Sequence, residues 1–156
     1  MTPLLTLHNP HDARRYYETG VWQRDTLYGL LARNAAERPV AWAVRDAMRR
    51  LRWRELLTEV DRVAEALEEV GVRPGERVSI WLPSRIEAST VLLACSRNGY
   101  VCCPSPHRNH TVAEVVTLME RMRTAAFIYQ TGFGADAGRH DIEAEMPHYL
   151  PAKRAR

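Results

Sequence analysis

Four candidate metal ligands lie within nine residues of one another, namely Cys102, Cys103, His107 and His110. Zinc binds thiolates and imidazoles, but zinc sites usually space paired cysteines by two to four residues so that both sulfurs can reach one ion. Adjacent cysteines on a strand point to opposite faces of the sheet instead. Together with Cys95 these cysteines stand in apolar stretches, which is typical of buried thiols in a reducing compartment. We therefore predict no metal site, and a small Cys/His zinc-binding module is the least favoured alternative.

Two segments, residues 84–87 and 111–114, carry the capping-box pattern, in which a hydroxyl and a carboxylate satisfy the free backbone donors of a helix's first turn. Each follows a predicted strand and a proline. In a parallel sheet such helix N-termini lie beyond the carboxyl ends of the strands, where ligands usually bind, and they favour anions. His107 and Arg108 stand just ahead of the second start and are placed to hold a phosphate. The alternative is that both patterns only begin helices and that Arg108 is a solvated charge.

The remaining candidates for chemistry point to no catalytic residue. Glycines at 132, 134 and 138 follow a predicted strand, but the third comes one residue late for a dinucleotide loop and no ribose-binding acidic residue follows on a second strand. The serines lack the strand-elbow context of a nucleophile. His140 and Asp141 are adjacent but have no nucleophile to serve. We predict a turn at the glycines, a surface pair at 140–141 and no catalytic residue.

The elements that position these residues alternate along the chain. Gly71 ends a helix, Pro74 and Gly75 form a turn, and the apolar strand that follows ends at Pro83. The pattern predicts helices at about 26–38, 54–70, 84–97 and 111–122, and strands at about 40–44, 51–53, 77–82, 100–103 and 125–129. Single helices between strands favour a parallel sheet. The predicted fold class is α/β, with alternating helices and mainly parallel strands.

The predicted organisation has three parts. Residues 1–25 form an irregular leader whose aromatics, Tyr16, Tyr17 and Trp22, pin it onto the body. Residues 26–140 form an incomplete α/β domain. Residues 141–156 form a basic tail.

Composition excludes several classes of protein. A hydrophobic share of 46% and a charged share of 26% are those of a globular chain. No apolar run reaches the roughly 18 residues that span a bilayer, and no basic leader precedes a short apolar stretch, so we expect a cytoplasmic protein without a membrane partner. Arginines 49, 50, 52 and 54 cluster, but a nucleic-acid surface needs a basic face with aromatics or a known recognition motif. The sequence indicates neither, and we predict no nucleic-acid partner.

A series of landmarks resembles the N-terminal region of the adenylate-forming (AMP-binding) enzymes of the acyl-CoA synthetase group, over about residues 15–140. The landmarks, in order, are LLARNAAERPVAWAV, the aromatic-x-Glu-Leu at 53–56, VDRVAEALEEVGVRPGERVSIWLP, Glu87, LACSRNGYVCCPSP and Glu114. The leader YYETGVW and the segment PSPHRNHTVAEV are most similar to ligases of cyclic or aryl carboxylates. Arg52 stands where the family often has Thr, and Ser84 where it often has Asn or Asp.

The resemblance implies an enzyme that converts a small carboxylate and ATP to an acyl-adenylate and then to a CoA thioester, with Mg²⁺. It also implies that His107 or Arg108 approaches a CoA phosphate. The family's ATP loop, rich in Ser, Thr and Gly and ending in lysine, and its later motifs and C-terminal catalytic lysine are absent here. Of the 22 basic residues only Lys153 is a lysine. We therefore expect a truncated N-terminal fragment that binds no cofactor and catalyses nothing alone.

Two further hypotheses follow from the same residues. In one, the chain is a non-enzymatic binding or regulatory module that docks onto a partner, such as a complementary chain supplying the missing motifs. In the other, sheet edges that the rest of the enzyme normally covers lead the chain to self-associate.

Overall fold

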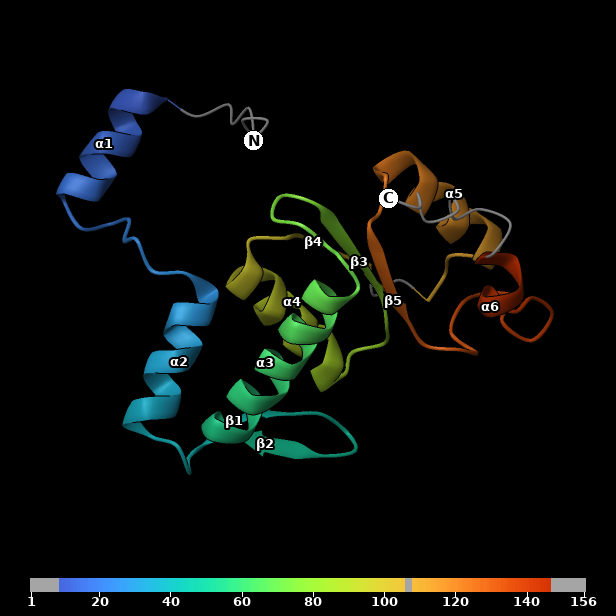
Figure 1. Ribbon diagram of the computed structural model, residues 1–156, viewed down its shortest axis with the longest axis horizontal. Helices are drawn as coiled ribbons and strands as arrows, with labels where there is room; N and C mark the ends of the chain where they lie inside the picture. Colours follow the sequence, from blue (N-terminus) through green and yellow to red (C-terminus); the bar gives the residue numbers. More distant parts are fainter. Residues whose placement is uncertain (1–8, 106–107, 147–156) are drawn as a thin grey trace.

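The computed structural model describes residues 9–105 and 108–146. Within them the elements follow one another in the order drawn in Figure 1. They are α1 (Pro10–Glu18), α2 (Leu27–Glu37), β1 (Trp42–Arg45), β2 (Arg50–Arg52), α3 (Trp53–Glu69), β3 (Arg77–Trp81), α4 (Ile86–Asn98), β4 (Val101–Pro104), α5 (Val112–Met122), β5 (Ala126–Tyr129) and α6 (Ile142–Glu145). The predicted alternation of helices and strands from residue 54 onward is confirmed.

The centre of the molecule is a three-stranded parallel sheet in the order β4-β3-β5. In its register Val78 lies opposite Cys102 on one side and opposite Ala126 on the other. β3 is the middle strand, and its residues Val78 to Trp81 are all buried. Burial on both faces is why this run is mostly apolar rather than alternating, with Ser79 as its polar member. The predicted α/β class with mainly parallel strands is confirmed.

Helices cover both faces of the sheet, α3 and α4 on one side and α5 and α6 on the other (Figure 1). Because side chains alternate along a strand, Val78 and Ile80 pack with α3 and α4, whereas Trp81 packs with α5, Phe133 and α6. The Ser79 hydroxyl, buried on the second face, hydrogen-bonds that of Thr124 at 2.8 Å. A separate cluster joins α2, β2, α3 and α4.

β1 and β2 form an antiparallel hairpin with a register irregularity between Trp42 and Val44. Leu51 and Val44 face the helices, with Leu51 buried in the cluster that joins α2, α3 and α4. The hairpin is therefore attached to the helical layer and does not extend the parallel sheet, as the separate strand orders show.

The leader and the tail both contain helices that the sequence analysis did not predict. Asn9 caps α1 and Pro10 occupies its first turn, both of which favour a helix start. The leader aromatics contact one another, with ring centroids 5.1 Å apart for Tyr16 and Trp22, and α1 stands away from the sheet in Figure 1. In the range predicted as a tail, α6 buries Ile142 against the core. No helix in the part of the chain that the structure describes is long and apolar enough to span a membrane.

Candidate functional site

The candidate site lies where β3 and β4 end and α4 and α5 begin. The predicted capping box at the start of α5 is confirmed: the Thr111 hydroxyl accepts from the Glu114 N–H at 3.3 Å, and Glu114 Oε2 accepts from the Thr111 N–H at 2.8 Å. Hydrogen bonds from the Thr111 backbone and hydroxyl hold the pKa of Glu114 below its ordinary value. The Val112 N–H donates to Asp136 Oδ1 at 2.9 Å, so a carboxylate 24 residues away satisfies the next donor of the first turn.

The predicted capping box at residues 84–87 is wrong. α4 begins at Ile86 with Arg85 as N-cap and without a side-chain capping bond. The Ile86 N–H donates instead to Asp46 Oδ2 at 3.1 Å, from the turn of the β1–β2 hairpin. Asp46 also accepts from the backbone N–H groups of Met48 and Arg49, each at 2.8 Å. The three backbone bonds, Arg49 first and Ile86 next, lower the pKa of Asp46 to about 2.

Glu87, the expected partner of Ser84, is held elsewhere because arginines compete for its carboxylate. Its Oε1 accepts from Arg49 at 3.0 Å, and its Oε2 lies 3.4 Å from Arg85 Nε. Arg49 also holds Glu59 on α3 with two bonds of 2.6 and 3.1 Å. A guanidinium that binds two carboxylates outweighs a single backbone donor as a partner for Glu87.

The two helix N-termini therefore offer less to an anion than the sequence analysis expected. Asp46 already occupies the first donor of α4, Asp136 occupies the first donor of α5, and the Thr111 hydroxyl occupies the third. The Glu114 carboxylate adds its charge at the Thr111 N–H. Three negative charges near these ends oppose another anion there. A phosphate at this edge would have to be held by side chains.

The side chains predicted for that role are placed as follows. Arg108 lies in the exposed turn before α5, and among residues 9–105 and 108–146 it has no hydrogen-bond or ion-pair partner. His107 lies outside the described residues. Arg108 is exposed, and its contact with a phosphate, like the placement of His107, stays a prediction.

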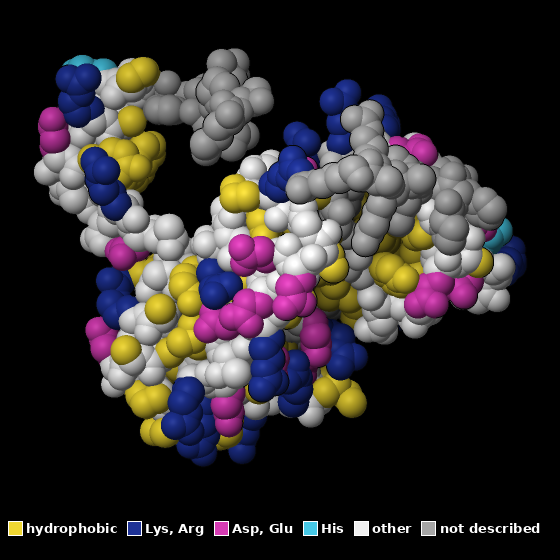
Figure 2. All heavy atoms as spheres, in the orientation of Figure 1, with side chains coloured by type: hydrophobic (Ala, Val, Ile, Leu, Met, Phe, Trp, Pro, Cys, Tyr) yellow, Lys and Arg dark blue, Asp and Glu magenta, His cyan; other side chains and the backbone are white. Residues whose placement is uncertain are grey.

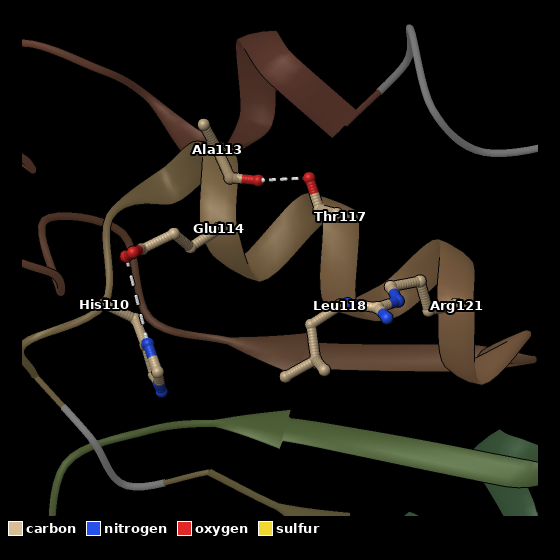
Figure 3. Close-up of a pocket in the computed structure, with 6 residues that line it drawn as sticks. All are labelled: His110, Ala113, Glu114, Thr117, Leu118 and Arg121. Carbon is tan, nitrogen blue, oxygen red and sulfur yellow. Dashed lines mark hydrogen bonds and ion pairs between the residues drawn. The ribbon is translucent and has the colours of Figure 1, made fainter.

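An open groove runs along the exposed face of α5, with a volume of about 410 Å³. His110, Ala113, Glu114, Thr117, Leu118 and Arg121 line it (Figure 3). His110 Nδ1 lies 3.9 Å from Glu114 Oε2, and the Thr117 hydroxyl donates to the Ala113 carbonyl at 2.9 Å. With its hydroxyl bonded to its own helix, Thr117 is poorly placed as a nucleophile. The groove can contact an apolar group through Leu118 and an anion through Arg121.

The cysteine and histidine candidates do not form a ligand cluster in the part of the chain that the structure describes, where no three His, Cys, Asp or Glu side chains converge. Cys95 is buried on α4 and packs near Cys102 of β4. Its hydrogen bond with Cys102, together with burial, raises the pKa of the Cys95 thiol. The Cys103 thiol donates to the Val101 carbonyl at 3.8 Å. Cys95 is a buried thiol, as predicted, whereas Cys102 and Cys103 are only half-buried.

The glycine-rich segment is a turn, as the sequence analysis predicted, and it also approaches the sheet closely. Gly134 has a φ of 136°, and a Cβ there would lie 2.7 Å from Trp81 Cη2. Ala135 then donates to the His110 carbonyl at 2.9 Å, and this contact brings Asp136 to the start of α5. After this turn, Asp141 caps α6, and His140 Nδ1 lies 3.3 Å from Glu145 Oε1. The predicted surface pair of His140 and Asp141 is therefore wrong, because each has a different partner.

Sequence reasoning missed Asp46 and Asp136 as capping residues. The signal for Asp46 was present, because an aspartate opening a turn binds backbone donors two and three residues later. Its bond to a helix 40 residues further on had no local signal.

Comparison with known proteins gives a consistent picture. A model of the AMP-binding enzyme family matches residues 31–152. An acetyl-coenzyme A synthetase of Deinococcus radiodurans is 39% identical over 85 residues, which cover 51% of this chain and 13% of that enzyme. A salicylyl-CoA synthase / salicylate adenylyltransferase of a Streptomyces species is 32% identical over 126 residues, covering 76% of this chain and 23% of that enzyme.

Solved structures agree with the sequence relatives. The apo structure of Mycobacterium smegmatis MbtA superposes with a TM-score of 0.67 at 31% identity, covering 78% of this chain and 23% of that one. The N-terminal domain of FACL13 from Mycobacterium tuberculosis superposes with a TM-score of 0.62 at 21% identity, covering 67% and 26%, and shows the shared fold alone. The chain spans less than a quarter of the length of these two curated relatives.

Proposed function

Because this chain belongs to the AMP-binding enzyme family, we propose that it is the N-terminal α/β part of an ATP-dependent acyl-CoA synthetase. The observation that carries the proposal is the family match over residues 31–152, which contain the three parallel strands and the helices on both faces. In the complete reaction a carboxylate oxygen attacks the α-phosphorus of ATP, releasing pyrophosphate and forming an acyl-adenylate. The CoA thiol then attacks the acyl carbon, and AMP leaves.

This chain's contribution to that reaction is structural. Mg²⁺ finds no three potential ligands that converge among the described residues, and the lone lysine, Lys153, lies outside them. The role of β3 and its flanking helices is to place the sheet edge beside which later segments would build the nucleotide site.

An ATP–pyrophosphate exchange assay tests the absence of activity. The 156-residue chain, offered acetate, benzoate, salicylate and a long-chain fatty acid in turn, should exchange at the rate of a protein-free control. Exchange above that rate with any acid would overturn the proposal that the chain is inactive alone. Reading the DNA beyond codon 156 supplies an independent test, since a Ser/Thr/Gly-rich loop ending in lysine would identify the rest of the enzyme.

An aryl carboxylate is the substrate class that we propose for the complete enzyme. The relative that covers 76% of this chain is named for salicylate, and another, of Streptomyces carzinostaticus, for a substituted naphthoate. Acetyl-coenzyme A synthetases are also relatives, so acetate is the competing substrate. The product of the full reading frame should give a higher kcat/KM in exchange with salicylate or benzoate than with acetate, and the reverse order would reject the aryl assignment.

Arg108, with His107, is our proposed contact for a CoA phosphate in the complete enzyme. Its support is the exposure of Arg108 and its lack of a partner in residues 9–105 and 108–146. In the product of the full reading frame, Arg108→Ala should raise the KM for CoA and leave the KM for ATP unchanged. Arg123→Ala removes the same charge beyond the other end of α5 and serves as the control. Equal effects of the two substitutions would show that only overall charge matters.

A partner chain is the second candidate, favoured by the sheet edges. β4 and β5 each pair on one side only among the described residues, and an unpaired strand edge is a template for another strand. Sedimentation of the 156-residue chain should show self-association. A compact monomer that melts cooperatively would argue against both self-association and an exposed core.

A further inference from the structure

The outer face of the β1–β2 hairpin carries arginines stacked on tryptophan. The Cζ atoms of Arg50 and Arg52 lie 4.1 and 5.1 Å from the centroid of Trp42, whose side chain is 51% exposed. Beside them, Arg38 Cζ lies 5.3 Å from the centroid of Trp53. We call these five residues the hairpin patch. Figure 2 shows arginine side chains gathered with hydrophobic ones over the position of β1 and β2 in Figure 1.

This face contradicts the premise on which the sequence analysis excluded a basic surface with aromatics. Arg49 and Arg50 are neighbours in sequence, but they are used differently. Arg49 binds Glu59 and Glu87 on the side of the helices. Arg50 lies on the outer side of the hairpin over Trp42. Only the three-dimensional arrangement separates the structural arginine from the surface ones.

The arginines of the hairpin patch lack carboxylate partners among the described residues. Within residues 9–105 and 108–146, no ion pair involves Arg38, Arg50 or Arg52, although Arg49, Arg85 and Arg97 are all paired. The nearby acidic groups are used internally. Asp46 binds backbone donors, and Glu55 Oε2 accepts from the Arg52 N–H at 2.7 Å. The patch therefore presents uncompensated positive charge.

The patch is also held in place. The Asp46 bond to Ile86 and the Arg49 bonds to α3 and α4 fix the turn of the hairpin on the helices. Leu51 is buried beneath it. A guanidinium stacked on an indole loses less side-chain freedom on binding than a free one, so this rigid surface favours association.

We propose that the hairpin patch docks an acidic segment of a protein partner. A guanidinium over an indole can keep its N–H edges free, and free edges match a carboxylate with two parallel hydrogen bonds. Arg50 and Arg52 are the arginines of the patch that can do this, because Arg38 uses Nε and Nη2 on Asn34 Oδ1. Arginine and tryptophan are also the residues most often dominant in protein interfaces. Single-stranded nucleic acid fits less well because base stacking requires an open aromatic face, and arginines lie over both Trp42 and Trp53. This docking surface is additional to the ligase function.

Fluorescence anisotropy with a labelled twelve-residue polyglutamate peptide tests the proposal on the 156-residue chain. Replacing Arg50 and Arg52 together by Gln should weaken binding about tenfold, as for interface hot spots. The control is the double replacement of Arg123 and Arg139 by Gln, which removes the same charge from two exposed positions outside the hairpin patch and should change binding less than about twofold. Circular dichroism verifies that each variant is folded.

Two further variants separate stacking from charge. Trp42→Ala leaves the net charge unchanged and should still weaken binding several-fold. Replacing Arg50 and Arg52 by Lys keeps the charge but removes the planar donors, and it should weaken binding as well. Equal losses from the hairpin and control double variants, or no loss in Trp42→Ala, would overturn the proposal. So would tighter binding of a dodecathymidine oligonucleotide than of the peptide, which would indicate a nucleic-acid surface.

Discussion

The first turns of α4 and α5 both have backbone N–H groups without a partner inside the helix, and the two helices satisfy these groups differently. In both helices the first N–H donates to an aspartate far away in the chain, Asp46 for α4 and Asp136 for α5. Only α5 adds a local capping box, between Thr111 and Glu114. In α4 the corresponding acid, Glu87, is bound to arginines instead. The comparison teaches that a capping pattern forms its bonds only where its acid has no stronger partner.

The two aspartates also differ in how many backbone N–H groups they accept. Asp46 accepts three backbone donors and connects the hairpin turn to α4. The Asp136 side chain accepts one backbone N–H of α5. Its position depends on the preceding turn, which approaches Trp81 and His110 closely. The start of α4 therefore depends on the hairpin, and the start of α5 on the turn at residues 132–136.

Gly134→Ala should have the largest effect, because it disturbs the turn that brings Asp136 to α5. The added Cβ would meet the fully buried Trp81 ring at 2.7 Å, at a φ of 136° that side chains rarely adopt. We expect a loss of about 3 kcal/mol in the free energy of unfolding, at the upper end for overpacking. Urea denaturation followed by tryptophan fluorescence measures it.

Gly138→Ala is the matched control, since a Cβ there meets nothing within 4 Å. Its stability should stay within about 0.5 kcal/mol of the unmodified chain. If the two substitutions cost the same, the turn does not approach Trp81 as described.

Asp46→Ala should destabilise the chain more than Asp136→Ala. The first substitution leaves three backbone donors without their partner, and the second leaves one. We expect a loss of about 1 kcal/mol for Asp136→Ala, the usual cost of removing a helix cap, and a clearly larger loss for Asp46→Ala. Thermal melts of the two variants rank them. The opposite order would mean that the hairpin turn does not support α4.

The Asp46 bonds should also make stability depend on pH in the acid range. Backbone hydrogen bonds lower the pKa of Asp46 from 3.8 to about 2 in the folded chain. The unfolded chain therefore binds more protons between these values, and stability must rise with pH across this window. The contribution of Asp46 is complete above about pH 4 and is lost as the pH falls towards 2.

Asp46→Asn isolates this contribution. The difference in urea midpoint between the unmodified chain and Asp46→Asn should be constant from pH 5 to pH 7 and should shrink below about pH 4. A difference that stays constant down to pH 2.5 would show that the ionised carboxylate is not what holds the three donors.

Local sequence signals predicted the elements well where the ends of those elements are formed by residues close in sequence. Gly71 and the turn at Pro74 separate α3 from β3, and Gly99 ends α4 in the left-handed conformation. The order of helices and strands implied the parallel sheet. The short helices α1 and α6 were missed because a helix of nine or four residues carries too little apolar periodicity to be recognised.

The site was less predictable because its contacts are long-range. The Thr111 box lies within four residues and was found, whereas the bonds of Asp46 and Asp136 span 40 and 24 residues. Periodicity also does not show that Arg49 faces the helices while Arg50 faces outward, since that depends on where β2 begins. The same limit concealed the hairpin patch.

The smallest expected effects come from Thr111 and Ser84, the two hydroxyl residues that begin the same capping-box pattern in the sequence. Thr111→Ala removes a bond to the Glu114 N–H and should cost about 1 kcal/mol, as for other N-caps. Ser84→Ala should stay within about 0.5 kcal/mol, because Ser84 makes no capping bond and α4 begins two residues later. Urea titrations of both variants at pH 7 measure the pair. Equal losses would mean that Ser84 caps α4 in solution. Glu87 would then have to leave Arg49 to complete the capping box. That outcome would reject the proposed competition between Arg49 and the start of α4 for the Glu87 carboxylate.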